Sequence, residues 1–407
     1  MTQWELFTTR SFVKDKEFYS TQIEDGLDVG LYPTIILFPD YNQMPKVIDN
    51  LCNYIQNKER KGEDFKITAH VNAGIIDFKS RQITESNEIK ACINFIHKVN
   101  KKLGYTAIKE ADVHAGSLHS FDDERRIRKT KSFKNIDATF TAEEYLTALE
   151  KTKDKVSHLR KYAQQKNINL LIENVSCINY ALIHLWDVLE KDYNIKDYLR
   201  NDKRHSQTPW IPSRIQKGDI GYWKDLAYIT DGDFCIDIEH LDQTVEYSKE
   251  FNFNMKGKRK PETMAQRKLL NIMGVWVKHG EPVLFEEEID SSEFIENLDG
   301  RIKQSHLVGQ VSMFYYDNGI KKIGSHTPIL FEDDEDPLKI VENDEKRREM
   351  GRKRREKIKK DLKALNNAGC RRGVFEIFLG SDIHSGNLWK YYNEVSRKNV
   401  ESVLNTL

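Results

Sequence analysis

The sequence predicts an α/β protein with a (β/α)8 TIM barrel, and three observations lead to this fold class. Short apolar runs rich in β-branched residues alternate with longer amphipathic segments, as they do in parallel sheets. Eight such units follow one another along the 407 residues. Many of the runs end on a single His, Glu or Asp, and a closed barrel brings the carboxyl ends of its strands together at one pocket.

The first half of the chain supplies four strands and the helices between them. Strands are predicted near 4–9 and at 34–38, 66–70 and 110–114. The spacing of Val47, Leu51, Tyr54 and Ile55 predicts a helix over about 46–57. Further helices are expected at about 88–102 and 142–165, the latter starting at a capping box that begins with Thr141.

The second half supplies four more strands, at 169–173, 233–237, 307–312 and 373–378. A minimal barrel needs about 250 residues, so we expect one domain over 1–407 with long insertions after strands five to seven. These insertions are predicted at about 190–232, 245–300 and 331–370. The last contains an acidic run and then a Lys/Arg-rich run, which we interpret as a solvated helix outside the barrel and away from the pocket.

The composition narrows the class of protein. The 64 basic and 64 acidic residues balance, so affinity for nucleic acid would have to come from local patches. Five scattered cysteines without CxxC spacing argue against a disulfide framework and a cysteine-based zinc site. No apolar run approaches about 18 residues and no signal pattern opens the chain, so we expect a cytoplasmic protein without a membrane partner.

The ends of five predicted strands carry His70, His114, Glu173, Asp237 and Glu376. Imidazole nitrogen and carboxylate oxygen are ligands for Zn²⁺, Mn²⁺ or Fe²⁺. Carboxylates inside apolar runs are costly to bury unless a cation accompanies them. The series therefore predicts a metal centre.

These motifs resemble the xylose isomerase-like TIM barrel superfamily, and within it the endonuclease IV (AP endonuclease) family most closely. The resemblance covers the strand ends from about 66 to 378. The family's His-Pro-Gly-Ser-His is similar to His114-Ala115-Gly116-Ser117-Leu118-His119, and its Ile-Glu-Asn to Ile172-Glu173-Asn174. Its Cys-Ile-Asp-x-x-His is matched in full by Cys235-Ile236-Asp237-Ile238-Glu239-His240, the most specific motif of the set. The resemblance implies two divalent metals bridged by Glu173, most often zinc, with manganese, magnesium or iron as alternatives.

The chain departs from this pattern on the seventh strand and in the loop after it. The family has a His at the end of that strand, whereas here His306 precedes the apolar run and Gln310 and Ser312 occupy the ligand positions. Either His306 or Gln310 could fill the place. The family's Asp-x-His is similar to Gly324-Ser325-His326, so a third site retains His240 and His326 without the Asp. Two neutral imidazoles alone should hold a third metal weakly.

The resemblance implies hydrolysis of a phosphodiester in nucleic acid with an abasic or altered sugar, an activity of DNA repair. Glu173 and Glu376 would be the catalytic carboxylates, Glu376 orienting the nucleophile. Two basic stretches after predicted strands are candidates for phosphate contacts: Arg125, Arg126 and Arg128 in the first, Lys258 and Arg259 in the second.

Two alternatives stay open. The first is a sugar isomerase or epimerase of the same superfamily, in which Glu, Asp, His and Glu from strands five to eight hold one metal. The second is a barrel that has lost catalysis and acts as a binding module.

Overall fold

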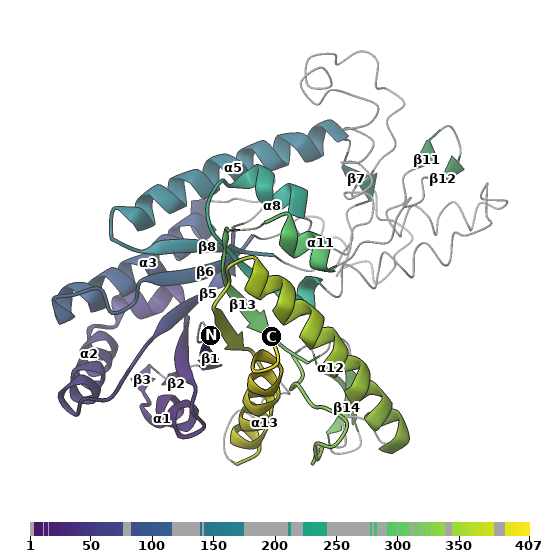
Figure 1. Ribbon diagram of the computed structural model, residues 1–407. Helices are drawn as coiled ribbons and strands as arrows, with labels where there is room; N and C mark the ends of the chain where they lie inside the picture. Colours follow the sequence, from purple (N-terminus) through teal and green to yellow (C-terminus); the bar gives the residue numbers. More distant parts are fainter. Residues whose placement is uncertain are drawn as a thin grey trace.

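A closed parallel barrel lies at the centre of the protein (Figure 1). The computed structural model describes residues 4–10, 12–14, 16–75, 83–115, 139–140, 142–174, 211–212, 223–241, 277–278, 281–282, 291–298, 300–309, 313–317, 320–324, 326–337, 344–377 and 387–407. The barrel strands are β1 (Glu5–Arg10), β4 (Tyr32–Leu37), β5 (Thr68–Gly74), β6 (Glu110–His114), β8 (Asn169–Glu173), β10 (Phe234–Asp237), β13 (Ile302–Leu307) and β16 (Arg372–Phe375). Each pairs in parallel with the next, and β16 closes the ring against β1. The predicted (β/α)8 barrel is confirmed.

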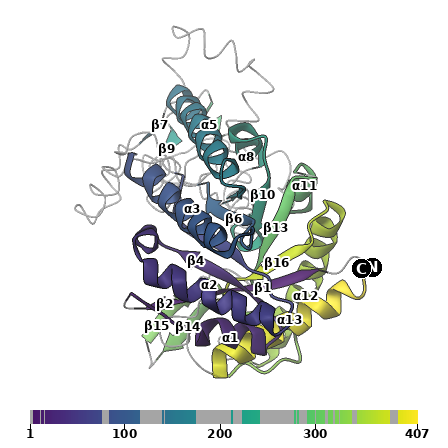
Figure 2. The same cartoon turned by 90° about the vertical axis from the view of Figure 1, so that its left-hand side faces the viewer.

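Helices alternate with these strands and surround them. They are α1 (Thr21–Asp28), α2 (Pro45–Arg60), α3 (Ile83–Leu103), α5 (Ala142–Gln164), α8 (Trp223–Ile229), α11 (Ser291–Glu296), α12 (Asp344–Asn367) and α13 (Asn387–Leu404). Figure 2 shows α2, α3, α5 and α8 following one another around the outside of the barrel. Outward-facing apolar residues of the strands and the buried faces of the helices form one hydrophobic core, to which Ile35 of β4 and Leu51 of α2 belong.

The predicted strand at 307–312 is wrong, because the structure places β13 at Ile302–Leu307. The prediction followed the more apolar stretch, but Gln304, Ser305 and His306 are all buried. A barrel strand has one side against the helices and the other in the interior, so polar residues that serve the interior are buried as fully as apolar ones.

The predicted insertion at 331–370 is also wrong over most of its length. It contains α12, the helix between β13 and β16, and Ile358, Leu362 and Leu365 of this helix belong to the common core. The other two expected insertions contain the short barrel helices α8 and α11, and most of their remaining residues lie outside the described ranges.

Smaller elements decorate the barrel. The antiparallel pairs are β2 (Val13–Lys14) with β3 (Glu17–Phe18), β7 (Thr139–Phe140) with β9 (Ile211–Pro212), β11 (Val277–Lys278) with β12 (Glu281–Pro282), and β14 (Met313–Asp317) with β15 (Ile320–Gly324). A 3₁₀ helix, η1 (Pro39–Gln43), precedes α2. Among the described residues, no helix has the length and apolar character needed to span a bilayer.

Candidate metal centre

The inner side chains of the barrel form two polar layers near the carboxyl ends of the strands. In the upper layer His114 is in register with Glu173, and Asp237 with His306. Residues two positions apart on a strand point to the same side. The layer beneath therefore contains Asp112, Cys235 and Gln304, each two positions before an upper-layer residue.

Glu173 lies at the centre of the upper layer and is fully buried. Its Oε1 is 3.2 Å from His306 Nδ1 and 3.6 Å from His114 Nε2. Its Oε2 is 3.6 Å from His70 Nδ1. Histidines from three different strands thus face one carboxylate, the arrangement expected of a bridging ligand.

Two overlapping groups of side chains are compact enough to hold a metal ion. One consists of His70, Asp112, Glu173 and His306, and the other of Glu173, Asp237, His306 and Glu376. Within each group, one ligand atom per residue lies within 4.8 Å of the others. Because Glu173 and His306 belong to both groups, two ions bound here would be neighbours.

The donor atoms fit a divalent cation. Within the described part of the chain, neither Glu173 oxygen, nor Asp237 Oδ2, nor either ring nitrogen of His306 makes a hydrogen bond. Buried carboxylates and imidazoles without hydrogen bonds are costly, and a cation removes that cost. The mixture of imidazole and carboxylate suits zinc, manganese or iron. Metal binding by these residues stays a prediction.

His306 resolves the ambiguity on the seventh strand in favour of the histidine. It is the penultimate residue of β13 and is fully buried. Its Nδ1 is 3.2 Å from Glu173 Oε1 and 3.2 Å from Glu376 Oε2. The alternatives Gln310 and Ser312 lie outside the described residues.

The lower layer contributes Asp112, which the sequence analysis did not identify. Its Oδ2 is 2.5 Å from His70 Nδ1 and 3.6 Å from His306 Nε2, while its Oδ1 accepts a hydrogen bond of 2.7 Å from Gln304 Nε2. A carboxylate that holds the far nitrogen of a metal-binding histidine is common in metal sites. The signal was present in the sequence, since Asp112 precedes His114 by two residues on one strand.

Asn174 positions the ligands at the ends of β8 and β10. Its side-chain amide pairs with the backbone of Asp237, accepting from N at 2.8 Å and donating to O at 3.0 Å. His240 Nδ1 lies 2.8 Å from the carbonyl oxygen of Asn174. Since a carbonyl only accepts, Nδ1 carries the proton, and the lone pair of His240 is on Nε2.

Burial and mutual charge shift the pKa values of the centre. Burial alone would lower the pKa of His70, but the carboxylates of Asp112, Glu173 and Glu376 raise it to about 9. The pKa of Glu376 is well below its usual range, because His306 and His326 outweigh the effect of burial. Burial lowers the pKa of His114 and favours the neutral imidazole that binds metals. The carboxylates are therefore ionised and prepared for a cation.

The outer predicted ligands are His240 and His326. Their ring centroids are 6.2 Å apart, and His326 Nδ1 is 4.0 Å from Glu376 Oε2. The predicted phosphate contacts at Arg125, Arg126, Arg128, Lys258 and Arg259 lie outside the described residues.

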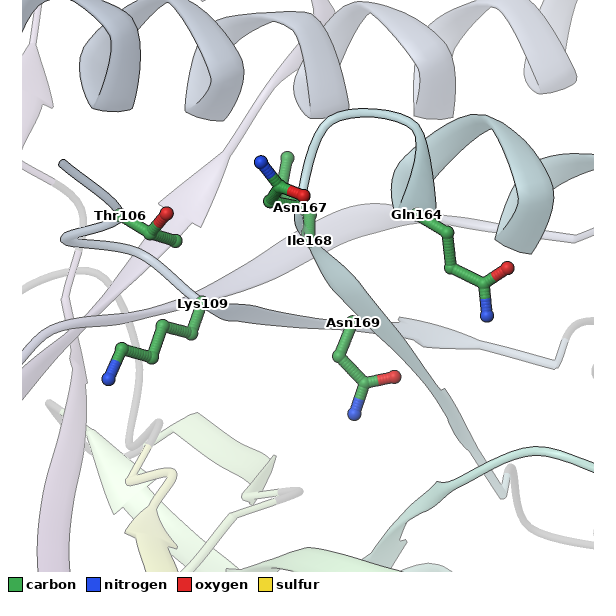
Figure 3. Close-up of a pocket in the computed structure, with 6 residues that line it drawn as sticks. All are labelled: Thr106, Lys109, Gln164, Asn167, Ile168 and Asn169. Carbon is green, nitrogen blue, oxygen red and sulfur yellow. The ribbon is translucent and has the colours of Figure 1, made fainter. Parts of the chain in front are cut away.

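A separate pocket of about 460 Å³ lies at the opposite end of the strands (Figure 3). Lys109 and Asn169 line it, and they stand at the amino-terminal ends of β6 and β8. In barrel enzymes the chemistry is at the carboxyl ends. The position of this pocket therefore argues against a role in the reaction.

Comparisons with known proteins return structures but no family. No protein-family model matches the sequence, and no curated protein does. An L-ribulose 3-epimerase matches at 9% identity and a TM-score of 0.48, covering 99% of this chain and 96% of that chain. A D-psicose 3-epimerase from Clostridium cellulolyticum matches at 9% and 0.45, covering 99% and 97%. Endonuclease IV from Thermus thermophilus matches at 12% and 0.40, covering 99% and 100%. Both classes of enzyme are among those that the strand-end motifs resemble, and these similarities do not distinguish between them.

Proposed function

We propose that this protein is a metal-dependent hydrolase of phosphodiesters in nucleic acid. The observation that carries the proposal is the pair of four-residue groups that share Glu173 and His306. A single ion needs only one such group. Two ions with a shared carboxylate are the usual arrangement for phosphodiester hydrolysis.

The residues divide between two metal positions. His70, His114 and Glu173 would hold one ion, and Glu173, Asp237, His306 and Glu376 the other. Divalent ions bound there would polarise a phosphoryl oxygen and stabilise the leaving oxygen. Asp112 keeps His70 oriented from below, and Asn174 keeps Asp237 in place.

Two upper-layer residues lie nearest to an approaching substrate. The His114 side chain is 28% exposed, more than that of Glu173 or His306, so it faces the mouth of the pocket. Glu376 keeps 8% of its side chain exposed and is ionised, so it can accept a proton from, or orient, a nucleophilic water.

One observation favours a second candidate, a sugar isomerase or epimerase. With His306 on β13, the set Glu173, Asp237, His306 and Glu376 takes one residue from each of four consecutive barrel strands. This is the Glu-Asp-His-Glu set that the isomerase resemblance requires, and Glu173 with Glu376 would move the proton. His70, Asp112 and His114 exceed what that reaction needs, which is why we place hydrolysis first.

The deciding experiment offers both substrates to the metal-loaded full-length protein. We expect incision of a duplex oligonucleotide that carries one abasic site, and no epimerisation of a ketohexose. Glu173→Gln should abolish the incision. Ketose turnover without incision would establish the isomerase, and neither activity in a protein with full metal content would leave the binding module.

The substrate class is tested through salt. Replacing Arg125, Arg126 and Arg128 together by Ala should weaken oligonucleotide binding and flatten its salt dependence, by about 0.9 in the logarithmic slope for each phosphate that is no longer neutralised. Bound metal should not change, because these residues are not ligands. Binding whose salt dependence is the same in the parent and the triple variant would exclude this stretch as the docking site.

A further inference from the structure

Glu239 is a buried carboxylate beside the two outer histidines. It is 1% exposed, and its Oε2 lies 2.6 Å from His326 Nδ1. Within the described ranges, neither of its oxygens makes a hydrogen bond. An ionised carboxylate in such a place needs positive charge next to it.

His240 directs a lone pair from the opposite side of this space. Its Nδ1 proton is held by the carbonyl oxygen of Asn174, so Nε2 is the nitrogen available to a ligand. Asp237 Oδ1 accepts from the backbone N of Glu239 at 2.7 Å and of His240 at 3.0 Å. One ligand of the deep centre therefore fixes the backbone of both outer residues.

His326 is held in place from the end of β13. The backbone N of Gly309 donates to Thr327 O at 2.7 Å, immediately after His326. A Cβ at position 309 would lie 2.0 Å from Pro328 O, so only glycine permits this approach of the two backbones. The segment that carries His326 is thus tied to the strand that carries His306.

We propose that Glu239, His240 and His326 form a third divalent-metal site. Glu239 would replace the Asp whose position in the endonuclease IV pattern is occupied here by Gly324. Two imidazoles and one carboxylate, with a fourth position open, form a ligand set of catalytic zinc. The expectation that this site lacks a negative ligand then no longer holds. The inference rests on the metal centre proposed above but not on the reaction.

The close contact between Glu239 and His326 is compatible with an ion. Bond lengths of about 2.0–2.2 Å place two ligand atoms of a tetrahedral zinc ion roughly 3.3 Å apart. The pair would have to separate by less than an ångström from its present 2.6 Å.

The test counts metals in the full-length protein. Chelator-treated protein is dialysed against Zn²⁺ and analysed for bound metal, and the titration is repeated with Co²⁺, whose absorption reports each occupied site. We expect three equivalents in the parent and two in Glu239→Gln, with the third cobalt signal lost. His326→Gln, on a different element, should lose the same equivalent. Glu345→Gln, an exposed carboxylate at the start of α12, is the matched control and should keep three.

Two results would overturn the proposal. A parent that binds no more than two equivalents has no third site, and Glu239 is then only the ion-pair partner of His326. Three equivalents in both Glu239→Gln and His326→Gln would place the third metal elsewhere. Three equivalents that depend on Glu239, in a protein without phosphodiesterase activity, would refute the proposed reaction and leave the site standing.

Discussion

Asp112 Oδ2 lies 2.5 Å from His70 Nδ1, so a carboxylate beneath the metal centre fixes which nitrogen of this histidine faces the ligands. The same oxygen is 3.6 Å from His306 Nε2. Because His70 and His306 belong to different proposed metal positions, Asp112 links the two from below.

Replacing this carboxylate should weaken both metals. Asp112→Asn keeps the size but loses the charge that orients and polarises the imidazoles, and such changes cost about 10–100-fold in metal affinity. Competition with a chelating indicator measures the effect. Asp49→Asn, on the exposed face of α2, is the control and should bind like the parent. Parent-like affinity in Asp112→Asn would mean that the contact does not support the centre.

Glu173→Gln should disturb the centre more severely, since a neutral amide is a poor bridge between two cations. We expect at least one metal equivalent to be lost and activity to fall by more than about 100-fold, the upper range for losing a mere supporting residue. Elemental analysis and single-turnover rates measure the two effects. Glu349→Gln, exposed on α12, should behave like the parent. Full metal content in Glu173→Gln would contradict the bridging role.

Metal binding should strengthen as the pH rises from 7 to 9. The pKa of His70 is raised to about 9 in the metal-free fold, so below that pH a proton must leave before a cation binds. Each displaced proton raises the apparent affinity by up to about tenfold per pH unit. Calorimetry in two buffers of different ionisation enthalpy should detect proton release at pH 7.5 and less of it at pH 9.5. An affinity that is flat over this range would show that the centre binds without displacing protons.

The metal-free protein should lose stability over the same range. The protonated form of His70 is favoured by the fold, so its contribution is complete below the ordinary pKa of about 6.5 and is lost as the pH rises through about 9. The melting temperature without metal should therefore fall from pH 6.5 to pH 9. With saturating metal it should not fall, because binding becomes stronger. A metal-free melting temperature that rises over this range would contradict the assignment.

Asn174 should matter for stability as well as for metal. Asn174→Ala leaves the backbone N and O of Asp237 without partners in a buried place, at a cost of about 1–3 kcal/mol in the free energy of unfolding. Asn169→Ala, at the other end of the same strand, removes a partly buried bond to Asp233 and should cost less. Denaturant titration of both variants measures the difference. Equal costs would mean that Asn174 is an ordinary strand-end residue.

The sequence by itself determined the barrel and most of its ligand positions. Apolar periodicity separates strands from helices, and His70, His114, Glu173 and Asp237 follow from it because each lies at or near the end of a short apolar run. Motif spacing added Glu376 and His240 for the same reason, since each is counted from a strand end. All of these positions depend on neighbours in the sequence.

Only the tertiary structure decided the seventh strand, the lower layer and the outer carboxylate. β13 contains Gln304, Ser305 and His306, so its apolar pattern is weaker than that of the residues after it, and only pairing with β10 and β16 fixes its place. Asp112 meets His70 and His306 across the barrel, and Glu239 meets His326 from a different loop. Contacts between strands far apart in the sequence leave no periodic signal along the chain, because their register is set by closure of the barrel.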